Sequence, residues 1–254
     1  MLSYQHAYHA GNPADLHKHA ALAALLDLLT RALHPITYLE SHAGRGVYDL
    51  SGAEARKTGE AARGIARVDV PEGAFAEALA AVRTRFGPSA YPGSPAIARV
   101  LLRRGDAMEL CEMHPAEHAA LKDVMRGSGA RVHRRDGHEA LLAHRPKRPG
   151  LALIDPSYEV KTEYAETAVT AVRLAERWHD GIVMVWYPIL SAARHFELTG
   201  AVERKMGAAC LKSEVTFHEV PERGMTGSGL LILNPPDGVE ELLEMAWEPF
   251  EVIF

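Results

Sequence analysis

The chain has 254 residues, which is enough for one large domain or two small ones with a full hydrophobic core. Apolar residues make up 47% of it and charged residues 24%, a composition that excludes general disorder. The net charge of −5, from 28 basic and 33 acidic residues, excludes a uniformly basic coat protein for nucleic acid. Any contact with RNA or DNA must therefore use a local basic patch.

Cysteine content and hydropathy narrow the class further. The only two cysteines, Cys111 and Cys210, exclude a disulfide framework and a cysteine-based zinc site, and they suit a reducing compartment. No apolar run approaches the ~20 residues that span a bilayer. The first residues, MLSYQHAYHAGNPADLHKH, are polar and unlike a signal peptide. We therefore expect a cytoplasmic protein that contacts no membrane. The one unusual feature of the composition is its content of 14 histidines.

The first predicted element is a helix. Residues 15–33 place apolar side chains at helical spacing, with Asn12 or Asp15 as the N-cap. His34 and Pro35 end this pattern.

A strand and an insert follow the helix. The β-branched and aromatic segment 36–41 predicts a short buried strand, and the glycines of 42–46 predict a tight turn after it. Residues 48–92 then change character, with a polar helical stretch, an amphipathic stretch and a cluster of Gly, Pro and Ser. This segment is typical of a small helical insert. We therefore expect one domain, 1–254, with the insert inside it.

Beyond the insert, helical and strand patterns alternate to the end of the chain. We expect strands at 107–113, 130–136, 150–158 (with a turn) and 181–188, and helices at 94–103, 114–126, 137–145, 162–179 and near 190–200. This alternation predicts a doubly wound, mostly parallel sheet. Two late strands, 212–220 and 227–236, have no helix between them and predict an antiparallel hairpin at the edge of the sheet.

Acidic residues finish four of the predicted strands, at Glu40, Glu112, Asp136 and Asp155. Ligands of such sheets bind at the carboxyl ends of the strands. The glycines after Glu40 let the backbone approach a ligand, and an acid at the end of the next strand can hold both hydroxyls of a ribose. This layout is typical of a Rossmann-like methyltransferase that uses S-adenosylmethionine. A plain structural turn remains the alternative for the glycines alone.

The segment Asp155-Pro156-Ser157-Tyr158 carries the stronger chemical signal. It resembles the Asp/Asn-Pro-Pro-aromatic motif of methyltransferases that act on adenine N6. The lone pair of that amine is delocalised into the ring, so a carboxylate and a backbone carbonyl that accept its N–H groups make it more nucleophilic. The proline fixes the carbonyl, the aromatic ring stacks on an extruded base, and Asp155 can accept the released proton. A simple β-turn is the alternative reading.

Two further segments are candidates for the active site. Asn234-Pro235-Pro236 matches the motif by its letters, but Asp237 follows where an aromatic residue is required, so we expect it to end the last hairpin strand. Trp186 and Tyr187 stand at the end of a predicted strand, and either ring can line the site.

Blocks along nearly the whole chain resemble one family, the bacterial ribosomal RNA large-subunit methyltransferase J family. They are the N-terminal segment quoted above and LESHAGRGVY, TGEAARGIARV, YPGSPAIARVLLR, Glu112-Met113-His114-Pro115, LALIDPSYE, WYP and RGMTGSGLLILNPP. The resemblance implies a Rossmann-like core with a small helical insert. It also implies methyl transfer from S-adenosylmethionine, with S-adenosylhomocysteine as product, to N6 of adenine 2030 in 23S rRNA.

The resemblance also implies roles for residues. Asp155 is implied as the catalytic acceptor, and Tyr4, Lys18, Pro156 and Tyr158 as substrate-binding residues. Contacts with S-adenosylmethionine are implied for His19, His42, Ser94, Glu112, Asp136 and Gly137. Ser157 departs from the proline of some members, which loosens the turn and puts the positioning of the base in question.

Histidines and basic residues offer other readings. His6, His9, His17 and His19 have spacings that fit zinc in principle, but no further ligand pattern accompanies them, so we expect no metal. Four basic clusters are candidates for RNA contact, and the insert is the best because it leaves the first strand beside the cofactor site. The clusters are Arg56, Lys57 and Arg63 in the insert; Arg99, Arg103 and Arg104; Arg131, Arg134 and Arg135; and Arg145, Lys147 and Arg148.

We therefore expect a monomeric RNA adenine-N6 methyltransferase that acts on 23S rRNA before the subunit is fully assembled. One alternative is a DNA adenine-N6 methyltransferase, which normally carries a separate target-recognition domain that this chain is too short to contain. The other is a non-catalytic RNA-binding protein with a methyltransferase-like fold. The acid at the end of each strand argues against it.

Overall fold

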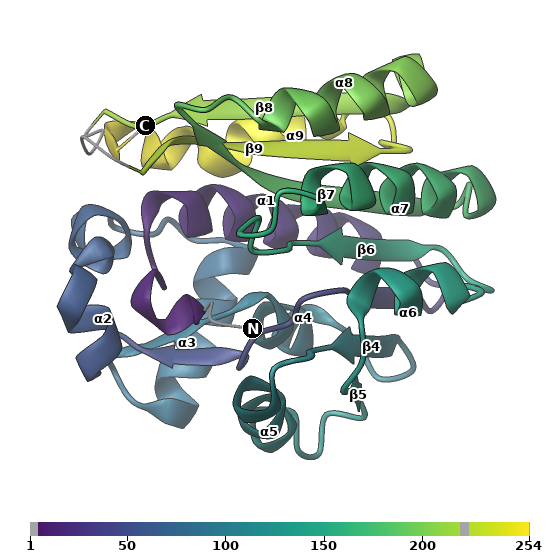
Figure 1. Cartoon of the computed structure of the whole chain (residues 1–254). Coiled ribbons are helices and arrows are strands. Elements are labelled where there is room, and N and C mark those ends of the chain that lie inside the picture. Colours follow the sequence, from purple (N-terminus) through teal and green to yellow (C-terminus); the bar gives the residue numbers. More distant parts are fainter. Residues whose placement is uncertain (1–4, 219–223, 254) are drawn as a thin grey trace.

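A seven-stranded sheet forms the centre of the computed structural model, which describes residues 5–218 and 224–253 (Figure 1). The strand order is β5-β4-β1-β6-β7-β9-β8. The strands are β1 (Thr37–Glu40), β4 (Ala107–Cys111), β5 (Arg131–His133), β6 (Gly150–Ile154), β7 (Gly181–Leu190), β8 (Cys210–Thr216) and β9 (Met225–Leu233). Every neighbouring pair up to β7 is parallel, and β9 runs antiparallel to both β7 and β8. The predicted parallel sheet and antiparallel edge hairpin are confirmed.

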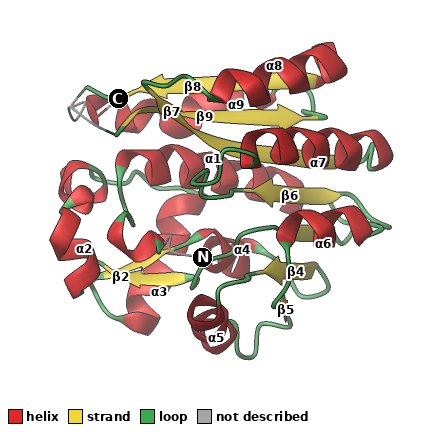
Figure 2. Cartoon of the chain, viewed as in Figure 1, coloured by secondary structure: helices red, strands yellow, loops and turns green. Residues whose placement is uncertain are grey.

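Helices cover both faces of the sheet (Figures 1 and 2). One face carries α6 (Gly137–Ala143), α7 (Glu163–Arg177) and α8 (His195–Met206); the other carries α1 (Pro13–Thr30), α4 (Ser94–Leu101) and α9 (Val239–Trp247). A further helix, α5 (Pro115–Val124), connects β4 to β5. The central strands β6 and β7 are buried on both faces, which explains their unbroken apolar runs GLALI and GIVMV. Helix α9 was not among the predicted elements. No helix in the described residues is long and apolar enough to cross a membrane.

Helix α1 is the most buried helix and lies against the sheet. Asn12 caps it by accepting the Asp15 N–H at 2.8 Å, and Pro13 occupies its first turn. The helix ends at Thr30, three residues before the predicted end. The Arg103 guanidinium accounts for this end, because it donates to the backbone carbonyls of Thr30, Ala32 and His34. The last carbonyl of the helix and two carbonyls just beyond it thus accept hydrogen bonds from a residue far away in the sequence.

Two short strands that the sequence analysis did not predict bracket the insert. They are β2 (Val47–Asp49) and β3 (Ala90–Pro92), which pair antiparallel. Between them lie α2 (Ala53–Thr58), α3 (Ala74–Phe86) and the 3-10 turns at Glu60–Arg63 and Ile65–Arg67. The insert contacts the segment before α1, since the Ile65 N–H donates to the Gly11 carbonyl at 2.9 Å.

Glu40 ends β1 in the core and is fully buried. Its carboxyl group accepts hydrogen bonds from the Tyr38 hydroxyl, at 2.9 Å, and from the Ser94 hydroxyl. Burial outweighs these two bonds and raises the pKa of Glu40 to about 8.

We therefore expect Glu40 to make the fold less stable as the pH rises. Between its unfolded pKa and about 8 the folded state binds more protons than the unfolded state, so the free energy of unfolding falls with pH in this window. Glu40→Gln should remove a fall on the order of a few kcal/mol between pH 5 and 9. Chemical denaturation of both proteins across this range measures the difference. Identical pH profiles would contradict the prediction.

Asn234 follows β9 and belongs to the scaffold. Its side-chain Nδ2 lies 3.1 to 3.2 Å from the carbonyls of Ala175, Trp178 and Gly181, and its φ is 53°. It thus ties the end of α7 to the start of β7. The expected end of the hairpin strand is confirmed, since β9 stops at Leu233.

Asn234→Ala should lower the free energy of unfolding by about 1–3 kcal/mol, because buried carbonyls lose their donor. Asn234→Gly is the matched control, since it removes the same bonds but tolerates a positive φ, and it should cost less. Denaturant titration measures both, and methyl transfer by the folded variants should be unchanged. A large loss of turnover at unchanged stability would assign Asn234 to the catalytic site instead.

Candidate active site

A cavity of about 370 Å³ opens at the carboxyl edge of the parallel strands. This volume is within the usual range for small-molecule sites. Every predicted site residue in the described part of the chain lines it: Lys18, His19, His42, Ser94, Glu112, Asp136, Gly137, Asp155, Pro156 and Tyr158. Tyr4 lies outside the described residues. The sequence therefore predicted residues that the fold brings to one place.

The glycine turn after β1 fixes the orientation of Glu112. The N–H of Gly44 donates to Glu112 Oε2 at 2.8 Å, and the N–H of His114 donates to Oε1 at 2.7 Å. Gly44 has a φ of 59°, which favours glycine there. Burial raises the pKa of Glu112 despite these two bonds. Each oxygen keeps a second lone pair, so the carboxylate can still accept hydrogen bonds from a ligand.

Helix α6 begins at the cavity wall. Asp136 caps the helix through Oδ1, which accepts the Glu139 N–H at 2.8 Å. Gly137 passes so close to the residue after β1 that a Cβ atom there would lie 2.0 Å from the Ser41 carbonyl oxygen. Beside it, burial lowers the pKa of His42 to about 3, so this imidazole is neutral at physiological pH. This part of the cavity wall therefore consists of closely packed backbone and an uncharged imidazole ring.

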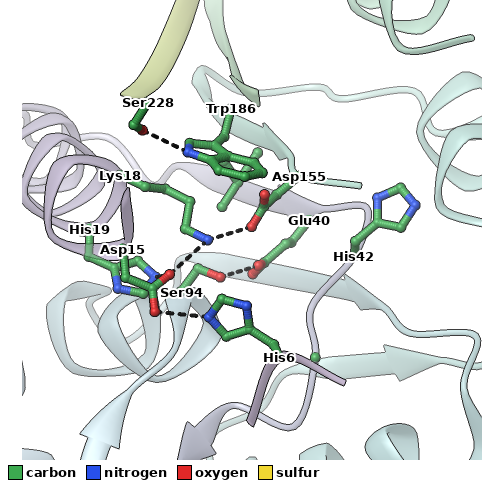
Figure 3. Close-up of polar contacts among 12 residues, drawn as sticks. His6, Asp15, Lys18, His19, Glu40, His42, Ser94, Asp155, Trp186 and Ser228 are labelled. Atoms are coloured by element: carbon green, nitrogen blue, oxygen red, sulfur yellow. Dashed lines mark hydrogen bonds and ion pairs between the residues drawn. The ribbon is translucent and has the colours of Figure 1, made fainter. Parts of the chain in front are cut away.

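A buried ammonium group lies beside the candidate catalytic acid. Lys18 Nζ contacts Asp155 Oδ2 at 2.7 Å and Asp15 Oδ1 at 3.2 Å, and its side chain is 5% exposed (Figure 3). Burial opposes the charge of Lys18, but the two carboxylates outweigh burial and raise its pKa above the usual value. Its ammonium also lies 5.3 Å from the ring centroid of Trp186. The arrangement holds Asp155 at the cavity wall.

Asp15 is a site residue that the sequence analysis considered only as a cap. Its Oδ2 accepts the Gly11 N–H at 2.9 Å and lies 2.9 Å from His6 Nε2. It thereby connects the segment before α1 to Lys18, and both His6 and Asp15 line the cavity. The positions of Asp15, Lys18 and His19 at i, i+3 and i+4 place them on one helical face, which is a signal that could have identified Asp15.

His19 and Ser94 already have protein partners at the cavity wall. His19 Nδ1 lies 2.9 Å from the Tyr91 hydroxyl, and burial lowers the pKa of His19 to about 3. The Ser94 hydroxyl donates to Glu40. Both side chains can therefore contact a ligand only through their remaining atoms or lone pairs.

The two aromatic candidates on β7 have different surroundings. Trp186 lines the cavity, and its indole Nε1 donates to Ser228 Oγ at 2.9 Å. Tyr187 points elsewhere, since its hydroxyl donates to Glu214 at 2.8 Å. Tyr158 lines the cavity as well, but its hydroxyl is engaged with the Trp186 carbonyl at 2.7 Å.

The N-terminal histidines contact different partners and do not converge on one point. His6 faces Asp15, His9 lies 2.9 Å from Glu60, and His17 lies 3.0 Å from Ser228 Oγ. Within residues 5–218 and 224–253, no group of three or more His, Cys, Asp or Glu side chains is arranged to hold a metal ion.

Comparison with known proteins identifies relatives along most of the chain. Residues 33–250 match the family model described as "Ribosomal RNA large subunit methyltransferase D, RlmJ". The chain is 38% identical over 253 residues to the ribosomal RNA large subunit methyltransferase J of Escherichia coli (strain K12), covering 95% of this chain and 90% of that protein. It is 35% identical over 248 residues to the Haemophilus influenzae protein of the same name, covering 93% and 88%.

Solved structures share the fold of this chain. Protein LPL1258 of Legionella pneumophila superposes with a TM-score of 0.85 at 32% identity, covering 97% of this chain and 94% of that chain. The methyltransferase domain of METTL16 has a TM-score of 0.52 at 9% identity, covering 88% and 69%, and shows the shared fold alone. The matched family model and the two sequence relatives establish that this chain belongs to the family of ribosomal RNA large-subunit methyltransferases.

Proposed function

We propose that this protein transfers the methyl group of S-adenosylmethionine to N6 of one adenine in 23S rRNA, adenine 2030, before the large subunit is fully assembled. The observation that carries the proposal is the position of Asp155. It follows β6 directly, lines the cavity and is held there by Lys18 within an Asp-Pro-Ser-Tyr segment. The names of the relatives support the rRNA substrate, and through it a cytoplasmic location.

The residues at the carboxyl ends of β1, β4 and β5 fit the cofactor. Glu112, pinned by two backbone N–H groups, would accept the ribose hydroxyls. The Asp136 carboxylate would accept from the adenine ring of the cofactor, and Gly137 lets the start of α6 lie directly against the Ser41 backbone at the cavity wall. When bound, S-adenosylmethionine supplies an electrophilic methyl group on a sulfonium sulfur.

The residues around Asp155 would activate the amine. One carboxylate oxygen, Oδ2, is engaged by Lys18, which leaves Oδ1 to accept an N–H of the target adenine. The Pro156 carbonyl would accept the second N–H, so that the nitrogen lone pair is directed toward the methyl group. The carboxylate then stabilises the positive charge that develops on nitrogen. The fixed ammonium keeps Asp155 from rotating away from this position.

The substrate class has a direct test. Purified protein should transfer labelled methyl from S-adenosylmethionine to protein-free 23S rRNA, and nuclease digestion should recover N6-methyladenosine. Assembled subunits should be poorer substrates, and DNA should not be methylated. Methylation of DNA instead would favour the DNA alternative, and no transfer to any nucleic acid would favour a binding protein.

Replacing Glu112 and Asp155 should separate cofactor binding from chemistry. Glu112→Ala should weaken S-adenosylmethionine affinity by about 1.5–3 kcal/mol, the contribution of a hydrogen bond to a charged group. Asp155→Ala should leave that affinity within a few-fold and lower kcat by orders of magnitude, because its contact strengthens in the transition state. Calorimetry and single-turnover methylation measure the two effects.

Asp155→Asn provides the control for this pair, because it keeps one acceptor oxygen but cannot take the proton. More activity than Asp155→Ala would mean that orientation of the amine dominates. Near wild-type turnover by Asp155→Ala at saturating cofactor and RNA would place the catalytic group elsewhere.

The insert offers a basic surface for the RNA. Arg56 and Lys57 are exposed on α2, and Lys57 Nζ lies 5.6 Å from the Tyr8 ring centroid. Each of the three other basic clusters is partly occupied within the fold, since Arg103 and Arg148 bind backbone carbonyls and Arg131 binds Glu109. The insert also contacts the segment that lines the cavity, so RNA bound there would lie near the site.

Removing three basic side chains of the insert should weaken RNA binding about tenfold or more and reduce the slope of log Kd against log salt by about 2, with cofactor affinity unchanged. The triple variant is Arg56→Ala, Lys57→Ala and Arg63→Ala. Filter binding at several salt concentrations measures both quantities.

The matched control removes the same charge from the loop before β6. This loop lies at the amino ends of the parallel strands, whereas the cavity opens at their carboxyl ends. Its side chains are exposed, and the variant is Arg145→Ala, Lys147→Ala and Arg148→Ala. This variant should bind RNA within about twofold of wild type. Equal losses in both variants would show that net charge, rather than the insert, determines the affinity.

A further inference from the structure

Tyr158 has a backbone conformation that needs support. Its φ is 56°, in the left-handed region that is uncommon for a residue with a bulky side chain. Such conformations persist where the surrounding structure holds them. Residues 155–159 form neither helix nor turn, so regular secondary structure does not supply that support. Moreover, Ser157 stands immediately before Tyr158, where the related motif has its second proline.

A tether from the side chain of Tyr158 supplies the constraint. Its hydroxyl donates to the Trp186 carbonyl at 2.7 Å, and both residues are buried. Burial raises the pKa of Tyr158 well above its usual value, so the hydroxyl stays protonated and remains a donor. The ring packs against Tyr164, with the two centroids 4.5 Å apart. The residue three positions after Asp155 is thereby fixed to the neighbouring strand.

The side chain of Trp186, whose main-chain carbonyl anchors the tether, is held from the opposite side. The Trp186 indole donates to Ser228 Oγ at 2.9 Å, and Ser228, on the antiparallel strand β9, is fully buried (Figure 3). His17 of α1 lies 3.0 Å from the same oxygen, and burial lowers its pKa to about 3, so its ring is neutral. Neither Ser228 nor His17 lines the cavity. Buried polar groups are costly unless they are paired, and this pairing immobilises Trp186.

We propose that the Tyr158 hydroxyl, anchored on Trp186, takes the place of the missing second proline and fixes the segment that positions Asp155. A proline restricts the backbone through its ring, whereas the tether restricts it through a hydrogen bond to a neighbouring strand. Tyr158 is a positioning residue in this respect, because its hydroxyl acts through Asp155 and Pro156. The inference rests on the proposed adenine-N6 methyl transfer.

Loss of the tether should slow the reaction without changing affinities. Tyr158→Phe keeps the ring and removes the hydroxyl, so we expect kcat to fall about tenfold while KM for RNA and the Kd for S-adenosylmethionine stay within about twofold. A small displacement of reacting groups acts mainly on the rate. Tyr164→Phe is the matched control. It removes a hydroxyl from the adjoining ring, which makes no hydrogen bond within the described residues, and it should keep wild-type kcat.

A second substitution distinguishes a positioning role from a general loss of packing. Within the described residues Ser157 makes one hydrogen bond, in which its hydroxyl accepts the Glu159 N–H at 3.5 Å. A proline there therefore removes no bond made by the Ser157 amide. Ser157→Pro in the Tyr158→Phe protein should restore kcat to within about threefold of the Ser157→Pro protein alone. Ser157→Ala in the same background should restore nothing.

Single-turnover methylation of 23S rRNA by the wild-type protein and these variants, with melting temperatures and calorimetry of S-adenosylmethionine, is the complete experiment. Rescue by proline and not by alanine supports the inference. It is overturned if Tyr158→Phe matches Tyr164→Phe, if proline does not rescue, or if Ser157→Pro alone abolishes activity. Failure of wild-type protein to form N6-methyladenosine would instead reject the proposed function, so the two failures are distinct. A Tyr158→Phe protein that lost stability and cofactor affinity together, and that proline did not restore, would also overturn it.

Discussion

The buried ammonium of Lys18 is the interaction on which the site depends. It lies between Asp15 on its own helix and Asp155 at the end of β6, and water has almost no access to it. Removing either carboxylate would leave a buried charge with half its compensation, which is far costlier than losing an exposed ion pair. Through Asp15 the same charge also orders His6 and the Gly11 backbone. The cation therefore joins the first helix, the segment before it and the candidate catalytic segment after β6 into one unit.

A parallel sheet brings the carboxylates at its strand ends to one edge. Their negative charges would repel each other there if all four were ionised in the same environment. The structure gives each a different environment. Glu40 is buried among hydroxyl donors, Glu112 accepts two backbone N–H groups, Asp136 caps a helix, and Asp155 pairs with Lys18. Four acids that look equivalent in the sequence can thus serve structure, cofactor and substrate separately.

Local patterns predicted the sheet, its closing hairpin and the strand-end residues, because hydrophobic periodicity and adjacency to a strand are written in short segments. What the sequence analysis missed depends on distant partners. Helix α1 stops at Thr30 because of Arg103, and the three-residue strands β2 and β3 exist only as a pair across the insert. The contact of Trp186 with Ser228 depends on the pairing of β7 with β9, which no local pattern encodes.

Gly64 of the insert packs directly on the backbone of Gly11, in the segment before α1. A Cβ atom at Gly64 would lie 2.1 Å from the Gly11 carbonyl oxygen, and Glu60 contacts both His9 and Asn12 nearby. The insert is therefore closely packed against, and hydrogen-bonded to, the segment before α1, which forms one wall of the cavity. Trimming it to obtain a minimal catalytic core would remove the support of that wall. An ancestral or engineered version without the insert would need a different way to close the pocket over its ligands.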